Sequence, residues 1–334
     1  MSLNLVNMDH GSGGKLTQNL IKIFTNYFDN NGSESMTDSA VFKNNTGISA
    51  FTTDSYVINP LDFPGGDIGK LAVCGTVNDL AVSGAVPMYL SCAFILEEGL
   101  EIEKLKEIVK SMAETAKRAN VKIITGDTKV VEKGACDRMF INTAGVGFLE
   151  EKHRAIGSGI DVKAGDKILI NGNIGDHGLA VLSIRNSFSN TIKSDCAPLN
   201  DLIKSCLKVN NSINFMRDAT RGGLAAVLTE LADKVNLGIS LEEKSIPLAE
   251  NTRGLCEFLG FDPLHLANEG KVIIVAGEGW EDILEVMKSH PLGINSSVIG
   301  TVVEKHHGKL VLKTEIGGNR IIDIPAGIQL PRIC

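Results

Sequence analysis

A glycine-rich loop that carries a lysine stands near the start of the sequence, at residues 10–15 (H-G-S-G-G-K). Glycines allow main-chain N–H groups to approach phosphate oxygens, and the lysine adds a positive charge. The P-loop spacing G-x-x-x-x-G-K-S/T is absent, and no strand is predicted before the loop, as a Rossmann site would need. The motif by itself indicates either a phosphate-binding loop or a mobile glycine-rich N-terminus.

Five aspartates lie at the ends of predicted elements or interrupt them. They are Asp54 (T-T-D-S), Asp67 (P-G-G-D), Asp79 (V-N-D-L), Asp127 (T-G-D-T-K) and Asp218 (M-R-D-A-T). Magnesium prefers hard oxygen ligands and shares them with substrate phosphates, so the set is suited to a magnesium–nucleotide site. A helix N-cap or a turn is the alternative for any single aspartate, and it is favoured for Asp67 and Asp127 taken alone. Asp79 lies in an apolar helix, where an unpaired carboxylate would be costly.

Two further motifs place charge beside glycine. In residues 217–223 (R-D-A-T-R-G-G), arginines flank an aspartate at the start of a helix. This arrangement could bind phosphate or a carboxylate, or it could be a capped helix with solvated arginines. Glu269, in Asn268-Glu269-Gly270, stands at a strand entrance and is a candidate general base, although an exposed turn glutamate is commoner.

The cysteines point to one candidate nucleophile. There are seven, an odd number, and no pair has C-x-x-C spacing, so neither a disulfide framework nor a zinc finger is indicated. Cys334 is the last residue of a proline-containing segment, which is the geometry of a carrier arm whose thiol can swing into a pocket. An accidental terminal cysteine is the alternative. Prenylation is excluded because it needs a cysteine fourth from the end.

Alternating strands and helices must position these residues. In the first part, periodicity predicts strands at 48–58, 88–96, 122–131 and 138–149, and helices at 68–82 and 102–119. In the second part it predicts helices at 178–185, 199–212, 223–235, 249–259 and 280–289. Strands are predicted there at 167–171, 239–242, 272–276, 298–303, 310–312 and 320–324. The charged segment 150–154 indicates a domain boundary, and residues from 324 onward are expected to form an extended, mobile tail.

The composition is that of an ordinary globular protein. The chain has 334 residues, of which 43% are hydrophobic and 22% charged, so about two domains are expected and wholesale disorder is excluded. Lys and Arg number 33 against 40 Asp and Glu, a net charge of −7 that gives no support to a nucleic-acid or anionic-membrane partner. Neither a signal-peptide core nor a run of 18 apolar residues is present, which predicts a cytoplasmic enzyme.

Taken together, the motifs resemble the HypE family of NiFe-hydrogenase maturation factors over nearly the whole chain. That family belongs to the superfamily of aminoimidazole ribonucleotide (AIR) synthetase and selenophosphate synthetase, from which the terminal cysteine separates it. The segments that carry the resemblance are HGSGGK, TTDSYVINPLDFPGGDIG, GTVNDLA, FILEEG, GDTKVV, MRDATRGGLA, NEG and PRIC.

The resemblance implies an ATP-dependent dehydration. A carbamoyl-transferring maturation factor would modify the Cys334 thiol, and the tail would fold into the ATP site of its own chain. The carboxamide oxygen would attack the γ-phosphate, and loss of phosphate and of the N–H protons would leave a thiocyanate. An iron-carrying maturation complex would then accept the cyanide. Phosphorylation turns a poor leaving group into a good one, and Mg²⁺ and lysine would stabilise the transferring charge.

The resemblance also assigns roles to residues. Cys334, Lys129 and Glu269 would be catalytic, with the last two handling protons beside the arriving thiol. Mg²⁺ would be held by Asp54, Asp67, Asp79 and Asp218. ATP would be bound by Gly11, Ser12, Gly13, Gly14, Lys15, Asp54, Asn78, Asp79, Asp127, Thr128 and Asp218.

The implied fold is α+β, with two mixed α/β domains of the AIR synthetase-like type. Residues 1–153 would bind ATP and dimerise by pairing of the N-terminal sheet, 154–323 would form the C-terminal domain, and 324–334 would be a mobile tail carrying Cys334. Two alternatives stay open: another ATP-dependent amide-activating ligase of the superfamily, and a non-catalytic nucleotide-dependent carrier that presents Cys334. Phosphate release that depends on modified Cys334 separates the carrier from the enzyme.

Overall fold

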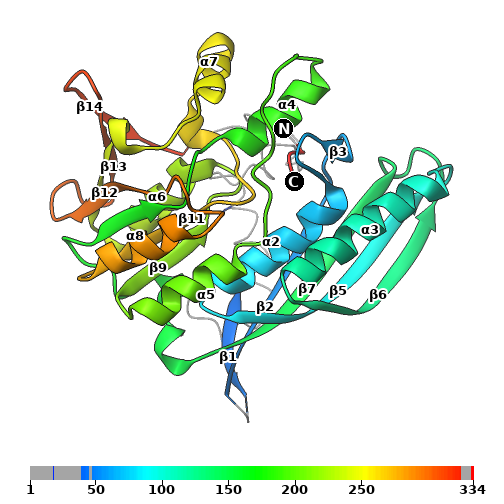
Figure 1. The fold of residues 1–334 in the computed structure, drawn as a ribbon, viewed down its shortest axis with the longest axis horizontal. Coiled ribbons are helices and arrows are strands. Elements are labelled where there is room, and N and C mark those ends of the chain that lie inside the picture. The colour runs from blue at the N-terminus through cyan, green and yellow to red at the C-terminus, as the bar shows by residue number, and fades with distance from the viewer. Residues whose placement is uncertain (1–17, 19–38, 45–46, 325–331) are drawn as a thin grey trace, which may run out of the picture.

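The computed structural model describes residues 18, 39–44, 47–324 and 332–334. Within them, two mixed β-sheets carry helices, and the second sheet follows the first in the sequence (Figure 1). The expectation of two mixed α/β domains is therefore confirmed. In the described part of the chain, no helix is both long and apolar enough to cross a membrane.

The first domain contains a five-stranded sheet. Its strands lie in the order β1 (Ala40–Asn44), β2 (Gly47–Tyr56), β7 (Met139–Leu149), β5 (Val86–Glu97) and β6 (Lys122–Val131). β5 and β6 run parallel, and the other neighbours are antiparallel. A short hairpin of β3 (Asp62–Phe63) and β4 (Gly66–Asp67) leads into α2 (Ile68–Val82). α2 and α3 (Ile102–Arg118) cover one face of this sheet (Figure 1).

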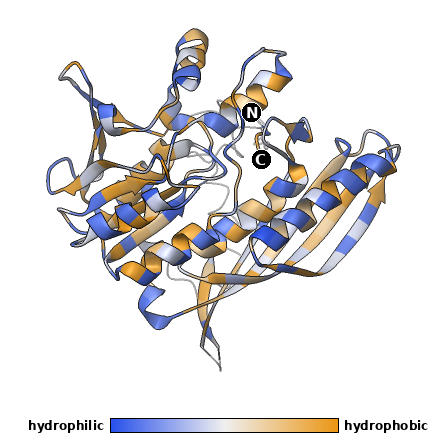
Figure 2. Ribbon diagram, viewed as in Figure 1, coloured by the Kyte–Doolittle hydropathy of each residue, from blue (hydrophilic) through white to orange (hydrophobic). Residues whose placement is uncertain are grey.

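Helix α2 is apolar on nearly all sides, as expected of a helix buried between two layers. It packs on β2 and β7 of its own domain and on α5 and β9 of the second domain. Asp67 caps its first turn, because carboxylate Oδ1 accepts the Lys70 N–H at 2.9 Å. At Gly75 a Cβ would lie 2.2 Å from the Tyr56 hydroxyl, so this close approach requires glycine. Helix α3 is amphipathic instead and turns a hydrophilic face outward (Figure 2).

The second domain contains a seven-stranded sheet. The order is β14 (Asn319–Ile322), β13 (Leu310–Lys313), β10 (Gly238–Glu242), β12 (Ser297–Val303), β8 (Lys167–Ile170), β11 (Val272–Ala276) and β9 (Ile213–Asp218). β10 and β13 run parallel, and the other neighbours are antiparallel. Its helices are α4 (Asp176–Arg185), α5 (Asn200–Val209), α6 (Gly223–Val235), α7 (Glu250–Leu259) and α8 (Trp280–Ser289).

Both faces of this second sheet are covered. Along β8, Ile168 and Ile170 belong to the same apolar cluster as α6, whereas Leu169 belongs to the cluster formed with α5 and α8. Strand β11 is buried at every position for the same reason. A strand buried on two faces reads as a continuous apolar run, which is why β11 was predicted at its observed bounds.

Among the strands, three features were not predicted from the sequence. Strand β1 and the hairpin β3–β4 are short, and the hairpin had been read as a turn. The third is strand β9, whose first residue directly follows the predicted helix at 199–212. That helix ends earlier, at Val209, so the chain has room for β9, which carries Asp218 at its end.

Candidate active site

The last three residues lie against the chain that follows β2. The Val57 N–H donates to the main-chain oxygen of Cys334 at 3.1 Å, and the Asn59 N–H donates to that of Arg332 at 3.5 Å. The Arg332 Nε–H donates to the Val57 oxygen at 2.9 Å, and its Nη1 forms an ion pair with Asp137 at 2.7 Å. The end of the tail is therefore docked on the first domain, and residues 325–331 lie outside the described part.

Docking buries the end of the tail. Ile333 is 3% exposed and belongs to the apolar core around α2, and half-buried Cys334 packs against that core. Burial raises the pKa of the Cys334 thiol to about 12, although the positive charge of Arg221 opposes this effect. The charges of Glu269, Asp54 and Asp218 raise this pKa further. The thiol of this docked state is thus protonated and surrounded by acidic groups.

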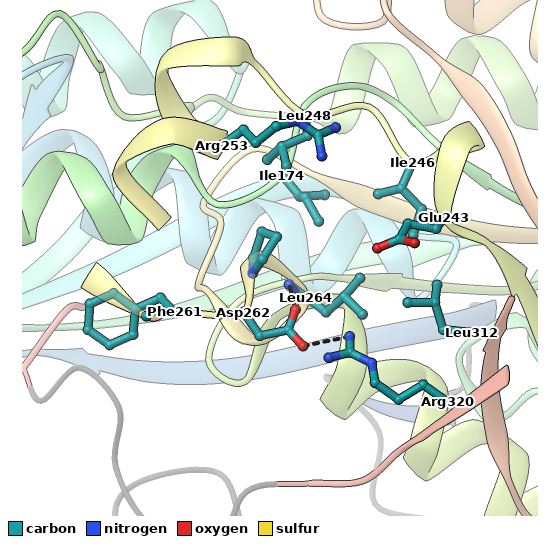
Figure 3. A pocket seen from close by; sticks show the side chains of 12 residues that line it. Ile174, Glu243, Ile246, Leu248, Arg253, Phe261, Asp262, Leu264, Leu312 and Arg320 are labelled. Carbon is teal, nitrogen blue, oxygen red and sulfur yellow. Dashed lines mark hydrogen bonds and ion pairs between the residues drawn. The ribbon is translucent and has the colours of Figure 1, made fainter. Parts of the chain in front are cut away.

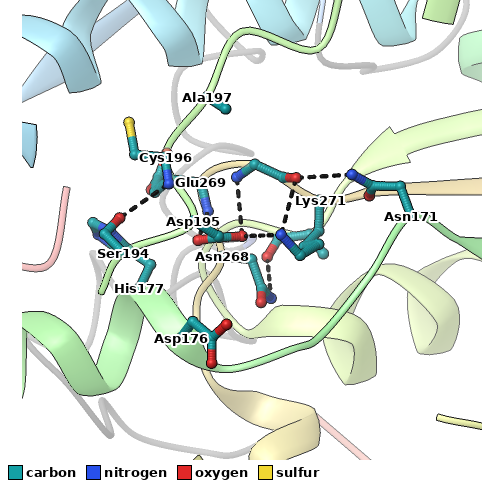
Figure 4. A network of polar contacts seen from close by, with 12 residues as sticks. Asn171, Asp176, His177, Ser194, Asp195, Cys196, Ala197, Asn268, Glu269 and Lys271 are labelled. Atoms are coloured by element: carbon teal, nitrogen blue, oxygen red, sulfur yellow. Dashed lines mark hydrogen bonds and ion pairs between the residues drawn. The ribbon is translucent and has the colours of Figure 1, made fainter. Parts of the chain in front are cut away.

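Glu269 lies in the turn before β11, and hydrogen bonds to the main chain hold this turn in place. The two carboxylate oxygens of Asp195 accept the N–H groups of Glu269 at 3.0 Å and Gly270 at 3.2 Å (Figure 4). Asp195 also pairs with the buried ammonium of Lys271 at 3.0 Å. A Cβ at position 270 would lie 2.0 Å from the Asp195 carbonyl oxygen, so the turn needs glycine to pack here.

The Glu269 side chain itself is short of partners. It is 4% exposed, and its Oε1 atom has no hydrogen-bond partner among the described residues. Burial raises the pKa of Glu269 well above its ordinary value, and the charge of Asp218 adds to this. A buried acid with a raised pKa is suited to proton transfer near neutral pH. The alternative of an exposed turn glutamate is therefore excluded.

Asp54 and Asp79 come together around the buried Tyr56. Asp54 lies in β2 and Asp79 in α2, where its Oδ2 accepts the Thr52 hydroxyl at 2.9 Å. Burial raises the pKa of Tyr56 well above its usual range, and the charges of both aspartates add to this. Burial also raises the pKa of Asp54, against the opposing effects of the Tyr56 hydroxyl and of Arg221. The cost predicted for a carboxylate in α2 is reduced by the Thr52 hydrogen bond.

Two predicted ligands have structural contacts. Asp67 is the N-cap of α2, which is the alternative favoured from the sequence. The Asn78 side chain is 1% exposed and acts as a cross-link: it donates to the carbonyl oxygens of Ala197 and Glu269 and accepts the Leu199 N–H at 2.8 Å. Asn78 thereby holds the Glu269 turn against α2.

Asp127, Thr128 and Lys129 lie on the exposed strand β6. The Lys129 ammonium pairs with Asp127 at 2.7 Å, and this hydrogen bond lowers the pKa of Asp127. Glu269 is coupled electrostatically to Cys334, whereas the Lys129 ammonium contacts Asp127. The predicted loop residues Gly11, Ser12, Gly13, Gly14 and Lys15 lie outside the described part of the chain.

The acidic groups around Cys334 are Glu269, Asp54 and Asp218. Among residues 39–44, 47–324 and 332–334, no three acidic, histidine or cysteine side chains form a metal shell. A nucleotide-bound Mg²⁺ does not need one, because one or two carboxylates, water and phosphate oxygens usually complete its coordination. Burial raises the pKa of Glu269, and the charges of Asp218, Asp195 and Asp54 raise it further, which shows a local surplus of acidic groups that a cation would relieve. These side chains therefore fit a divalent ion.

Sequence reasoning missed several residues of this site. Asp195 lies in an irregular segment before α5, and no motif marks it. His177 and Arg185, both on α4, contact the tail through its main chain, which leaves no trace in side-chain patterning. Tyr56 stands in the quoted segment T-T-D-S-Y, and its alternation with Asp54 in a strand was the available signal.

Two pockets lined by described residues contain none of the residues predicted for catalysis. One of about 350 Å³ lies in the second domain, where Asp262 and Arg320 form an ion pair at 2.7 Å in its wall (Figure 3). Another of about 690 Å³ is lined by residues of both domains, including Phe148 and Leu207. Neither includes Cys334, Glu269 or the aspartates around Tyr56.

The architecture matches one class of proteins. Residues 36–149 match the family model described as AIR synthase related protein, N-terminal domain, and residues 163–313 match its C-terminal counterpart. The fold and its two domains thus define an AIR synthase-related protein.

Comparison with individual proteins is more specific. The chain is 46% identical over 337 residues to the carbamoyl dehydratase HypE of Rhodobacter capsulatus, with 98% of each chain covered. It is 47% identical to a chain of the crystal structure of a HypE–HypF complex, with a TM-score of 0.85, covering 93% of this chain and all of that one. It is 44% identical to a HypE crystallised in complex with ATP, with a TM-score of 0.83, covering 99% of this chain and all of that one. The chain belongs to the HypE family of carbamoyl dehydratases, enzymes of hydrogenase maturation.

Proposed function

We propose that this enzyme dehydrates the S-carbamoyl group on its own C-terminal Cys334 to a thiocyanate at the expense of ATP, supplying the cyanide ligand for the iron of NiFe-hydrogenase. The observation that carries the proposal is the docking of Cys334 beside Glu269 and the buried aspartates. A docked thiol places its substituent within reach of acid–base groups. Family membership supports the reaction type.

The proposed reaction follows from the balance of atoms. The carbamoyl oxygen attacks the γ-phosphate of ATP, which releases ADP, and cleavage of the resulting C–O bond then releases phosphate. Both amide protons leave the nitrogen as the C≡N bond forms. Glu269 is the proposed acceptor of one proton: its Oε1 has no hydrogen-bond partner among the described residues, and its carboxyl, neutral in the nucleotide-free chain, would ionise when a cation binds beside it. Lys129 is proposed to stabilise charge, or to take the other proton after its ammonium has given one up, and either role requires it to leave Asp127.

ATP is proposed to bind with Mg²⁺. The nucleotide site would comprise the loop of residues 11–15, which lies outside the described part, together with residues of α2, β2, β6 and β9. A HypE that is 44% identical was crystallised with ATP. Asp54, Asp67, Asp79 and Asp218 would hold the ion, which would neutralise the phosphates. Because Asp67 already caps α2 through Oδ1, its other oxygen would have to serve.

A homodimer is proposed from the face of the first sheet opposite α2 and α3. Large apolar side chains on this outer face are 38–46% exposed in the single chain. They are Phe42, Phe51, Tyr89, Ile95 and Phe148. Paired residues of neighbouring strands share a face, so the register places them together. A second copy is the proposed occupant.

The same register brings nucleotide-site residues to that face. Asp127 is paired with Ala93, and Lys129 with Ile95, so both side chains share the outer face. A dimer would therefore place this part of the predicted nucleotide site at the interface between two copies. Phe51→Lys should dissociate the dimer in sedimentation experiments, and a wild-type monomer at micromolar concentration would refute the proposal.

Further proposals concern the limits of the domains and the partners. The boundaries 1–153, 154–323 and 324–334 are supported by the end of the first sheet at Leu149 and of the second at Ile322. A HypF-type protein is the proposed carbamoyl donor, since a relative was crystallised with HypF. An iron-carrying complex is the proposed cyanide acceptor, and no nucleic-acid or membrane partner is proposed.

Mass spectrometry of the C-terminal peptide tests the function. The protein is incubated with the carbamoyl donor system, then with ATP and Mg²⁺, and the peptide is released by cleavage after Glu315. A carbamoyl adduct on Cys334 should be replaced by a cyano adduct, with release of one phosphate per chain. Cys334→Ala is the matched control and should release no phosphate. A carbamoyl adduct that persists in the wild type after ATP addition would refute the proposal.

A further inference from the structure

The docked tail is recognised mainly through its main chain. The carbonyl oxygen of Arg332 accepts from the Arg185 guanidinium and from the Asn59 N–H, and that of Ile333 accepts from His177 Nε2 at 2.8 Å. The main-chain oxygen of Cys334 accepts from Val57. Each of the three residues is thus held by a main-chain oxygen, which in Cys334 belongs to the terminal carboxylate. The identity of the group on the Cys334 sulfur does not enter these contacts.

His177 is fixed as a hydrogen-bond donor. A carbonyl oxygen can only accept, so Nε2 must carry the proton toward Ile333. Nδ1 then accepts from the Ser194 hydroxyl at 2.8 Å, and the Ser194 oxygen accepts the Cys196 N–H at 3.1 Å. Phe63 packs edge-on against the imidazole. The ring is completely buried, and burial lowers the pKa of His177, which keeps the ring neutral and this tautomer in place.

Arg185 joins the tail to the chain beside it. Its Nε–H donates to the carbonyl oxygen of Asn59 and its Nη2 to that of Arg332. One guanidinium therefore binds both segments with a rigid fork of donors. Arg185 and His177 are eight residues apart on α4, so one helix of the second domain presents both donors.

We propose that His177 and Arg185 form a latch that positions Cys334 for dehydration by binding the main chain of the tail, whatever group the sulfur carries. The effect of the latch on the dehydration rate rests on the proposed function, whereas its effect on the exposure of the Cys334 thiol does not. The latch holds free, carbamoylated and cyanated tails alike. Its strength sets the share of chains whose Cys334 is exposed to a partner protein.

Two processes should respond in opposite directions when the latch is weakened. An undocked thiol regains an ordinary pKa of about 8.5, so it reacts faster with external reagents. Dehydration requires the docked tail and should slow. Leaving a buried carbonyl without its donor is expected to raise the undocked fraction about 5- to 150-fold.

The first experiment needs neither ATP nor a carbamoyl donor. The full-length protein is treated with a maleimide at pH 7.5, and labelling of Cys334 is followed in the peptide released after Glu315, with Cys136 as internal reference. His177→Leu and Arg185→Met should each accelerate labelling about 5- to 150-fold. His177→Gln, whose amide can replace Nε2–H, should restore most of the protection. Ile184→Ala, on the exposed side of α4, is the matched control and should label as the wild type does.

The second experiment measures conversion of preformed carbamoyl-Cys334 in a single turnover. His177→Leu and Arg185→Met should slow thiocyanate formation while circular dichroism and ATP binding are retained. Arg185 is half-buried, so Arg185→Met gives a folded variant even where His177→Leu does not. Unchanged labelling in Arg185→Met, or equal labelling in His177→Gln and His177→Leu, would overturn the latch. Faster labelling in a protein whose wild type forms no thiocyanate would leave the latch standing and refute the proposed function.

Discussion

Glu269→Gln should make this protein more stable at neutral pH and almost inactive. In the folded chain Glu269 is buried, its Oε1 has no hydrogen-bond partner among the described residues, and burial raises its pKa well above the ordinary 4.5. The unfolded chain releases this proton near pH 4.5, while the folded chain retains it. The free energy of unfolding therefore falls as the pH rises from about 4.5 toward the raised pKa of Glu269 in the folded chain. Glutamine has no proton to lose and escapes this loss.

The size of the effect has a ceiling. At pH 7 the medium is 2.5 pH units above 4.5, and each unit corresponds to about 1.36 kcal/mol, so retaining the proton costs at most about 3.4 kcal/mol. A gain of about 1–3 kcal/mol is expected at pH 7, because glutamine removes the ionisation that stabilises the unfolded wild-type chain. The gain should vanish at pH 4, where Glu269 holds its proton in the folded and in the unfolded wild-type chain. Loss of a general base should slow thiocyanate formation about 10²- to 10⁴-fold.

Reversible urea unfolding at pH 4, 5.5 and 7 measures the stability, and single-turnover mass spectrometry measures the rate. Glu304→Gln, an exposed glutamate, is the matched control and should change neither quantity. A variant that is less stable than the wild type at pH 7, or equally stabilised at pH 4 and pH 7, would contradict the buried neutral carboxyl. Unchanged thiocyanate formation would assign the base elsewhere.

Three other changes follow from the same contacts. Asp195→Asn should lower the free energy of unfolding by about 3–5 kcal/mol, because it strands the buried Lys271 ammonium; Lys271→Met in the same chain should recover part of the loss in urea unfolding. Burial favours a high pKa for Asp195, but the Lys271 ammonium and the Glu269 N–H lower it below the usual value. This stabilisation should therefore be present above pH 3.8 and be lost as acid protonates the folded chain. Asp79→Asn keeps an acceptor for Thr52, so calorimetry should show weaker Mg–ATP binding with little change in melting temperature. Lys129→Met should slow thiocyanate formation and leave the melting temperature unchanged, because its ion pair is exposed; a large drop in melting temperature would instead make Lys129 structural.

Much of the secondary structure was predictable because local patterns decide it. The helix at 68–82 and the strands at 122–131 and 272–276 appear at the predicted bounds, since each is a long segment with clear periodicity or apolar content. Strand β9 was missed because its sequence, I-N-F-M-R-D, mixes polar and apolar residues, and its partner β11 is more than 50 residues away. The pairing that stabilises β9 is therefore invisible to a local reading.

The site was predictable in its residue types but not in its support. Cys334 and Glu269 were singled out from short motifs, and the structure places them in one electrostatic cluster. Nothing in the sequence around Asp195 indicates that its carboxylate holds the Glu269 turn. Such a contact joins two irregular segments that are 74 residues apart, and only the folded chain brings them together. The positions of the nucleotide and metal residues stay predictions.

The docked tail has a kinetic consequence. Strand β14 ends at Ile322 in the second domain, and ten residues later Arg332 lies on the first domain, so the reacting thiol is tethered to its own catalytic groups. A short tether corresponds to an effective concentration in the millimolar range, whatever the amount of protein in solution. The dehydration step should therefore be first order in protein and insensitive to dilution over the range in which the proposed dimer stays intact. A separate small molecule with a carbamoyl thiol would have to reach millimolar concentration before it competed with the tethered Cys334 for the site beside Glu269.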